Sequence, residues 1–215
     1  DLGKIIKNKT HIQTIYNPVV TKRFELQAIQ EVESIFPEGC GLKLITSGRL
    51  VVQKDYPTLL RALSFYRKNY GMAHLVILGE GTLLQELESL TEQLKINENV
   101  SFLGFVDNPL AYIKQADIFV ISSAWEGFCN VIVEALYVGR KVVSTDCESG
   151  PAEILCNGQF GELAKVKDPV DIAKKIHHVV QKYYDPKKQK SRALEFTSEK
   201  KSQEFLKVFE EVLVI

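Results

Sequence analysis

Short apolar runs alternate along the chain with segments whose apolar residues recur every three or four positions. The runs are apolar at successive positions, which is typical of strands buried on both faces, and the segments between them have the periodicity of helices. We expect strands at residues 42–47, 74–78, 100–103, 117–121, 141–144 and 161–164. Buried strands joined through helices form a parallel sheet, and right-handed connections place helices on both of its faces. The pattern therefore predicts a doubly wound, Rossmann-like α/β fold.

Helices are expected between these strands and at both ends of the region. They are predicted at residues 21–36, 56–70, 83–94, 110–115, 151–155 and 170–184. A further helix is predicted directly after residue 129. Residues 187–214 are also predicted to be helical, and the last helix of the chain begins at residue 198. Pro37 should end the first helix, and Thr82 should cap the third through its hydroxyl. A short strand is predicted at residues 10–16, where apolar and polar side chains alternate.

Composition excludes several classes of protein and of site. The chain has 215 residues and a formal net charge of zero, so nothing in it favours binding to nucleic acid. Its four cysteines lack the Cys-x-x-Cys spacing of zinc sites, and they fit reduced thiols in the cytoplasm. No apolar run in the sequence is long enough to span a bilayer. Because the chain opens with Asp1-Leu2-Gly3, we expect a fragment of a longer protein.

One stretch, residues 122–136, is expected to carry the chemistry. It follows the strand predicted at residues 117–121, begins with a turn of small polar residues and glycine, and continues as an amphipathic helix. A strand, a turn and a helix in this order direct unpaired backbone amides at an anion. Glu126 lies in the turn, and Glu134 lies about two turns into the helix. A carboxylate at such a place either caps the helix or holds hydroxyl groups of a ligand whose phosphate lies on the amides.

The same stretch resembles the signature of a known enzyme family. It reads Glu126-Gly127-Phe128-x-Asn130-x-x-x-Glu134-Ala135 and is similar to the motif of retaining glycosyltransferases of family 4, which have two Rossmann-like domains. The resemblance continues at residues 139–146 and 149–155, reaches back to residues 47–55, and covers roughly residues 17–175. Several separate motifs in the right order are far more specific than one Gly-rich turn. The resemblance implies that this chain is the C-terminal, donor-binding half of such a two-domain (GT-B) enzyme.

The resemblance assigns roles to residues after the first strand and in the turn. Gly48, Arg49 and Lys54 match the segment that binds the donor's diphosphate, where two cations stabilise the charge that develops as the sugar leaves. Glu126 matches the residue that contacts the transferred sugar and supports the reaction. Arg49, Lys54 and Glu126 are therefore the predicted catalytic residues. The alternatives are two surface cations in a loop and a glutamate that caps the helix.

Residues around the start of the predicted helix are expected to bind the donor through their backbone. The amides of Asn130 and Val131 are expected at a phosphate, and the backbone of Phe128 and Cys129 at sugar hydroxyls. One residue departs from the family's pattern, because Cys129 stands where the family usually has proline.

Three further residues match positions that bind the nucleoside. The resemblance implies that Glu134 bonds the ribose hydroxyls and that Phe105 and Val106 contact the base. The alternatives are a solvated helix position for Glu134 and simple core packing for Phe105 and Val106. Trp125, beside Glu126, is expected to pack against the protein instead of serving as a platform for sugar.

The resemblance implies a hexosyltransferase that moves a hexose or N-acetylhexosamine from a nucleotide diphosphate sugar to a glycan or lipid-linked acceptor, as in bacterial polysaccharide biosynthesis. A UDP-sugar is favoured, GDP-mannose stays open, and neither a metal nor another cofactor is expected. Residues 1–20 would be the tail of a missing N-terminal domain that supplies the acceptor site, residues 21–190 the donor-binding domain, and residues 191–215 a C-terminal helix. We expect this chain alone to bind nucleotide without transferring sugar. The full-length protein is expected in the cytoplasm, associated peripherally with the membrane.

Other classes of function remain as alternatives. The chain could be a non-catalytic nucleotide-sugar binding module, or a donor-binding subunit that takes its acceptor half from a partner protein. A phosphorylase would need a lysine for pyridoxal phosphate in a matching context, and an epimerase would need further acid–base residues, so the transferase motif fits better. The last helix carries an apolar stripe through Phe205, Val208, Phe209 and Val212, which is expected to be partly exposed or to pair with another copy.

Overall fold

The computed structural model describes residues 13–213 of the chain. At its centre is a parallel sheet with the strand order β3-β2-β1-β4-β5-β6. The strands are β1 (Leu42–Ser47), β2 (Ala73–Leu78), β3 (Val100–Gly104), β4 (Ile118–Ile121), β5 (Lys141–Thr145) and β6 (Glu162–Ala164). The predicted Rossmann-like fold is confirmed, and so are the strands predicted within it.

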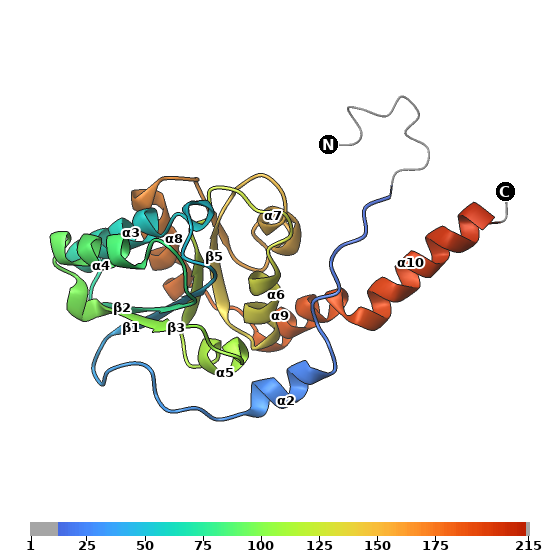
Figure 1. Cartoon of the computed structure of the whole chain (residues 1–215), viewed down its shortest axis with the longest axis horizontal. Helices are drawn as coiled ribbons and strands as arrows, with labels where there is room; N and C mark the ends of the chain where they lie inside the picture. The colour runs from blue at the N-terminus through green and yellow to red at the C-terminus, as the bar shows by residue number, and fades with distance from the viewer. Residues whose placement is uncertain (1–12, 214–215) are drawn as a thin grey trace.

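Helices cover both faces of the sheet (Figure 1). The described helices are α2 (Arg23–Ile29), α3 (Tyr56–Asn69), α4 (Leu84–Gln93), α5 (Pro109–Ile113), α6 (Asn130–Tyr137), α7 (Pro151–Ile154), α8 (Pro169–Gln181), α9 (Pro186–Ala193) and α10 (Ser198–Leu213), of which α10 contributes to neither core. Successive residues of a strand point to opposite faces, so the sheet has two cores. One core joins Leu44 and Val120 to α3, α4 and α8, and the other joins Ile45 and Phe119 to α5, α6 and α9.

The order of the strands reverses at β1, which pairs with β2 on one side and with β4 on the other. The chain leaving β1 enters α3 on one face, and the chain leaving β4 enters α6 on the opposite face. Because the strands are parallel, these two connections begin at the same edge of the sheet. Ligands of doubly wound sheets bind at this edge, beyond the carboxyl ends of the strands.

The first helix is shorter than the sequence predicts. α2 ends at Ile29 and residues 30–36 are irregular, so the predicted helix to residue 36 is wrong. Lys114 Nζ donates a hydrogen bond of 2.6 Å to the carbonyl of Gln30, and the Gln115 side chain both donates to and accepts from the backbone beyond it. These side chains from another part of the chain satisfy backbone groups that a longer helix would have paired.

Two smaller predictions are also wrong. α4 begins at Leu84 and no side chain caps it, so Thr82 is not its cap. The amide of Leu83 donates instead to the carbonyl of Leu50, at 3.2 Å. The described part of residues 10–16 forms no strand, and the rest of that segment lies outside the described residues.

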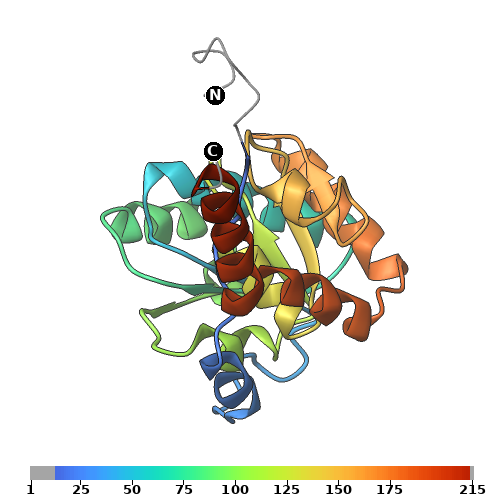
Figure 2. The same ribbon diagram turned by 90° about the vertical axis from the view of Figure 1, so that its right-hand side faces the viewer.

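The N-terminal segment and the start of α10 lie side by side. The amides of Val19 and Val20 donate to the carbonyl of Phe196, at 2.9 and 3.0 Å, and Val20 forms an isolated parallel bridge with Thr197. From this point α10 runs away from the sheet (Figure 1, Figure 2). The segment that enters the domain and the residues just before α10 are thus joined at one place.

The apolar stripe of α10 is largely exposed, as predicted. Phe205 and Phe209 are 45% and 61% exposed, and Val208 is half-buried. The side chain of Val212 lies outside the described residues. Within residues 13–213, no helix combines the length and the apolar character needed to traverse a bilayer.

Candidate functional site

The loops after β1 and β4 are joined into one unit at the carboxyl edge of the sheet. The hydroxyl of Ser122 donates to the carbonyl of Lys54 at 2.7 Å, and the amide of Ala124 donates to the carbonyl of Gln53 at 2.8 Å. Gln53 Nε2 in turn donates to the carbonyl of Trp125 at 3.0 Å. The sequence placed these two loops at one edge, and the structure brings their side chains into contact.

Lys54 and Glu126 form an ion pair between the two loops. Lys54 Nζ lies 2.5 Å from Glu126 Oε1, and the Glu126 side chain is only 7% exposed. Ser123 Oγ donates to the same oxygen at 2.6 Å, and Gln53 Nε2 lies 3.5 Å from Glu126 Oε2. The cation predicted to act on the diphosphate and the carboxylate predicted to contact the sugar therefore lie side by side. Glu126 does not cap α6, because the N-cap residue is Cys129 and no side chain caps that helix.

Arg49 lies one residue beyond Gly48, immediately after β1, and its side chain is exposed. Among the described residues, no hydrogen bond or ion pair fixes its guanidinium. The carbonyl of Gly48 accepts a hydrogen bond of 2.9 Å from the hydroxyl of Tyr56. Arg49 is thus available to an anion at this edge, whereas Lys54 is already paired with a carboxylate.

The loop between β5 and α7 packs closely against the turn that precedes α6. Gly150, in the loop between β5 and α7, has φ of +83°, and a Cβ there would lie 2.8 Å from the carbonyl oxygen of Gly127. Only glycine allows this approach. Cys129 has φ of −77°, a value that the proline of the resembled family would also adopt. Burial raises the pKa of the Cys129 thiol, so this group is a neutral packing residue and no nucleophile.

Asn130 and Val131 are the first residues of α6, whose first-turn amides receive no side-chain cap. An uncapped helix start carries a partial positive charge and unpaired N–H donors, which suit an anion. The side chain of Asn130 is exposed and accepts a hydrogen bond of 3.2 Å from Asn17 Nδ2. Sequence reasoning did not assign Asn17 to the site, and the one signal there was the turn Tyr16-Asn17-Pro18 at the chain's entry into the domain.

Glu134 is not a solvated helix residue. Its Oε2 is shielded from solvent and has no hydrogen-bond partner among the described residues. Burial disfavours the charged carboxylate and raises the pKa of Glu134 to about 7. A shielded acceptor without a donor is rare in a folded protein, and hydroxyl groups of a ligand would supply donors.

The residues predicted to contact the base, Phe105 and Val106, lie farther along the sheet edge than the Lys54–Glu126 pair. Phe105 and Val106 follow β3, which is separated from β1 by β2. Phe105 is 70% exposed, and its amide donates to Glu80 Oε1 at 3.4 Å, so core packing does not explain it. Val106 packs against the core, as its alternative interpretation held. Trp125 is 52% exposed, so it packs against the protein only in part.

Metal ligands do not gather in the part of the chain that the structure describes: no group of three His, Cys, Asp or Glu side chains there could hold a metal ion.

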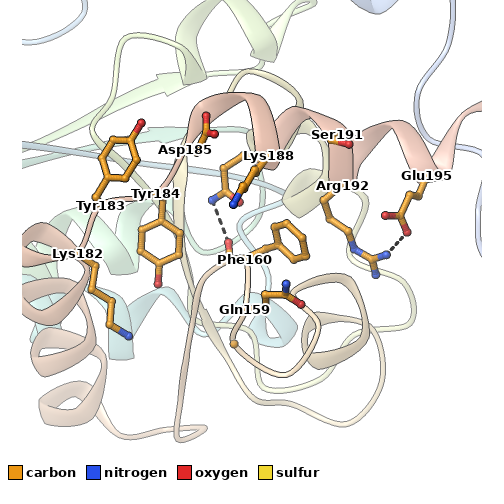
Figure 3. Close-up of a pocket in the computed structure, with 12 residues that line it drawn as sticks. Gln159, Phe160, Lys182, Tyr183, Tyr184, Asp185, Lys188, Ser191, Arg192 and Glu195 are labelled. Atoms are coloured by element: carbon orange, nitrogen blue, oxygen red, sulfur yellow. Dashed lines mark hydrogen bonds and ion pairs between the residues drawn. The ribbon is translucent and has the colours of Figure 1, made fainter.

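A cavity of about 540 Å³ lies elsewhere, between the loop before β6 and the junction of α8 and α9 (Figure 3). Its lining includes Phe160, Tyr184 and Lys188 and none of the predicted site residues. Arg192 turns toward Glu195 at its rim (Figure 3). At the carboxyl edge near β1 and β4, a small pocket is lined by residues that include Ser47, Lys54 and Ser123.

Comparison with known proteins agrees with this geometry. The family model described as "Glycosyl transferases group 1" matches residues 34–196. An uncharacterized glycosyltransferase of Methanocaldococcus jannaschii is 36% identical over 162 residues, which are 71% of this chain and 38% of the relative. A Campylobacter jejuni enzyme, N-acetylgalactosamine-N,N'-diacetylbacillosaminyl-diphospho-undecaprenol 4-alpha-N-acetylgalactosaminyltransferase, is 33% identical over 157 residues, or 72% of this chain and 40% of the enzyme. The chain thus spans about 40% of the length of these curated relatives.

Solved structures share the fold. A mutant of S. aureus TarM in complex with Fondaparinux, alpha-GlcNAc-glycerol and UDP has a TM-score of 0.77 and 22% identity, covering 97% of this chain and 41% of that one. The apo form of the lipopolysaccharide outer core galactosyltransferase WaaB has a TM-score of 0.75 and 23% identity, covering 93% and 56%. Anabaena HepE in complex with UDP has a TM-score of 0.69 and 20% identity, covering 88% and 51%. At these identities the likeness establishes the architecture alone.

Proposed function

The chain belongs to the group 1 glycosyl transferases, and we propose that it is the donor-binding domain of a retaining glycosyltransferase of family 4. The donor would be a nucleotide diphosphate sugar, and the acceptor a hydroxyl of a glycan or of a lipid-linked sugar. The observation that carries the proposal is the meeting of Lys54, Glu126 and the uncapped start of α6 where the strand order reverses.

The diphosphate is assigned to the start of α6. The amides of Asn130 and Val131 would donate to its oxygens, and the exposed Arg49 would add a second charge from the loop after β1. Lys54, which pairs with Glu126, would face this anion with its remaining N–H donors. As the bond to the sugar breaks, negative charge grows on the leaving phosphate, and cations already in place stabilise that charge without having to rearrange.

The sugar and the nucleoside occupy the two sides of the diphosphate. Glu126, held by Lys54 and Ser123, would accept hydrogen bonds from hydroxyls of the transferred sugar, beside the backbone of Phe128 and Cys129. On the other side, the shielded Oε2 of Glu134 would accept hydrogen bonds from the ribose hydroxyls. The base would then reach toward the loop after β3, with Phe105 and Val106.

The configuration of the anomeric carbon is retained if the acceptor attacks the face from which the phosphate leaves. The bond from the anomeric carbon to the phosphate oxygen breaks, a bond from that carbon to the acceptor oxygen forms on the same side, and the acceptor's proton passes to the leaving phosphate. The protein then contributes orientation and charge stabilisation, and this scheme uses no metal ion or other cofactor.

UDP is the favoured nucleotide, because TarM and HepE, which share the fold, were solved in complex with it. A lipid-linked acceptor is favoured because the Campylobacter relative is named for one. An enzyme with such an acceptor would act at the cytoplasmic face of the membrane as a peripheral protein. The acceptor site would lie on a further domain of the full-length protein, and this chain by itself would bind donor without transferring sugar.

A non-catalytic nucleotide-sugar binding module, or a donor-binding subunit with a partner acceptor subunit, is the second candidate. The structure favours an enzyme over a plain binding module through the buried Lys54–Glu126 pair. Such a pair adds little net stability, so a role in the reaction explains it better than a role in folding.

Titration calorimetry with UDP, GDP and ADP tests the proposal on this chain. We expect selective binding of one diphosphate that weakens more than tenfold in Arg49→Ala, since a charge-assisted contact is worth about 1.5 to 3 kcal/mol. Arg61→Ala is the matched control, because Arg61 is an exposed arginine on α3 and lies outside the predicted site.

A folded chain that binds none of the three nucleotides would overturn the proposal, and so would equal losses in the two arginine variants. The full-length protein then separates the enzyme from the binding module. Transfer of radiolabelled sugar from the selected donor identifies an enzyme, and tight binding without transfer or donor hydrolysis identifies a module.

A further inference from the structure

The segment that enters the domain is anchored against the loop that holds the start of α6. The ring of Tyr16 stacks on Phe128, with 5.3 Å between centroids and 27° between planes. Both rings also contact Phe196, at 6.0 and 5.3 Å. Beyond Tyr16, the amides of Val19 and Val20 are bonded to the Phe196 carbonyl. Asn17 therefore lies between two fixed points of the chain, and its side chain contacts Asn130 at the start of α6.

Asn17 makes one side-chain hydrogen bond within residues 13–213. Its Nδ2 donates a hydrogen bond of 3.2 Å to Asn130 Oδ1, across 113 residues of sequence. A primary amide has one oxygen acceptor and one nitrogen with two N–H donors. Because Asn17 donates to the oxygen of Asn130, the contact orients the Asn130 amide and leaves both N–H donors of its NH₂ group available to a ligand. Among the described residues, no other side-chain hydrogen bond sets which of the two orientations the Asn130 amide adopts.

We propose that Asn17 is a positioning residue of the donor site, which holds the Asn130 amide so that its N–H donors face the diphosphate. The inference rests on the proposed function and extends it to a residue outside the resembled motif. The chemistry is complementary: an amide nitrogen donates to a phosphate oxygen, whereas an amide oxygen would repel it. The stack of Tyr16 on Phe128 keeps the two asparagines in register.

A double-mutant cycle on Asn17 and Asn130 tests this coupling in this chain, with binding of UDP, GDP and ADP and of the matching nucleosides measured by calorimetry. Asn17→Ala should weaken binding of the selected diphosphate about fivefold, the value of one ordinary hydrogen bond, and leave nucleoside binding unchanged. In the Asn130→Ala background, Asn17→Ala should change the diphosphate affinity less than twofold. Asn17→Asp should bind more weakly than Asn17→Ala, because a carboxylate only accepts hydrogen bonds and adds negative charge.

Asn69→Ala is the matched control, since Asn69 is an exposed asparagine at the end of α3 whose Nδ2 donates to the Phe65 carbonyl at 2.8 Å. Its diphosphate affinity should equal that of the unaltered chain. A merely structural role for Asn17 would weaken diphosphate and nucleoside alike and would add to the effect of Asn130→Ala; either result overturns the inference while the proposed function stands. If the unaltered chain binds no diphosphate, the proposed function fails and this inference fails with it.

Discussion

Replacing Glu134 by Gln should stabilise the unliganded chain at high pH and leave it nearly unchanged at low pH. Oε2 of Glu134 is shielded and has no partner among the described residues, and burial raises the pKa from its ordinary value of 4.5 to about 7. Folding therefore favours the protonated carboxyl. Between these two pKa values the folded chain binds more protons than the unfolded chain, so its stability falls as the pH rises.

The magnitude follows from the shift. A pKa raised from 4.5 to about 7 destabilises the folded chain by about 3 kcal/mol at pH 8, where Glu134 is charged in both states, and by less than about 1 kcal/mol at pH 5. Glutamine has the shape of the protonated acid and carries no charge, so Glu134→Gln should recover most of this energy. Urea unfolding of both proteins at pH 5 and pH 8, followed by circular dichroism, measures the difference.

The same variant should lose affinity for the nucleotide, because an amide accepts hydrogen bonds from ribose hydroxyls less strongly than a carboxylate does. A residue that weakens the apo fold and strengthens binding is expected at a functional site. Glu162→Gln is the matched control, since Glu162 is a buried carboxylate whose pKa is shifted in the opposite direction. The reasoning is refuted if Glu134→Gln is as unstable at pH 8 as the parent chain, or less stable than it.

Three further perturbations test other parts of the site and its support. Lys54→Ala should destabilise the chain by about 2 to 3 kcal/mol in urea unfolding, because it leaves the carboxylate of Glu126 buried without its cation, and Lys54→Ala combined with Glu126→Gln should restore part of the loss. Burial alone would raise the pKa of Glu162, but hydrogen bonds and charge from two lysines outweigh burial and lower the pKa. Glu162→Gln should therefore be less stable than the parent chain at pH 7, and the difference should disappear as the pH falls below 4.5. Equal stabilities of the two proteins at both pH values would contradict this prediction. Gly150→Ala should cost about 1 to 3 kcal/mol, since alanine is strained at φ of +83° and its Cβ would meet Gly127, and an unchanged melting temperature would show that this loop yields freely.

Most of the fold could be predicted because its signals are local. The strand Ala73–Leu78 is apolar at nearly every position, and such a run reports burial on both faces without reference to the rest of the chain. Helix ends were less predictable. α2 ends at Ile29 because Lys114 and Gln115, some 80 residues away, take over the backbone groups of the next turn. The sequence pattern within residues 21–36 cannot indicate this, because Lys114 and Gln115 lie outside it.

In the candidate site, too, the sequence predicted some features, and others depend on contacts that only folding creates. The motif placed Lys54 and Glu126 at one edge of the sheet, and the structure shows that they are paired. The sequence alone left Glu134 either solvated or functional, and only the packing of α6 decides that its Oε2 is shielded. Asn17 was not identifiable as a site residue, because its partner Asn130 is 113 residues away.

The sequence by itself determined the alternation of strands and helices, the parallel sheet and the edge at which the motif residues gather. These depend on periodicity and connection length, which residues close together in the chain carry. Only the tertiary structure decided which charges are paired, which carboxylate is left without a donor, and which distant asparagine supports the start of α6. Burial and pairing depend on groups that folding brings together, and the free energy of a charge depends on that environment more than on its neighbours in sequence.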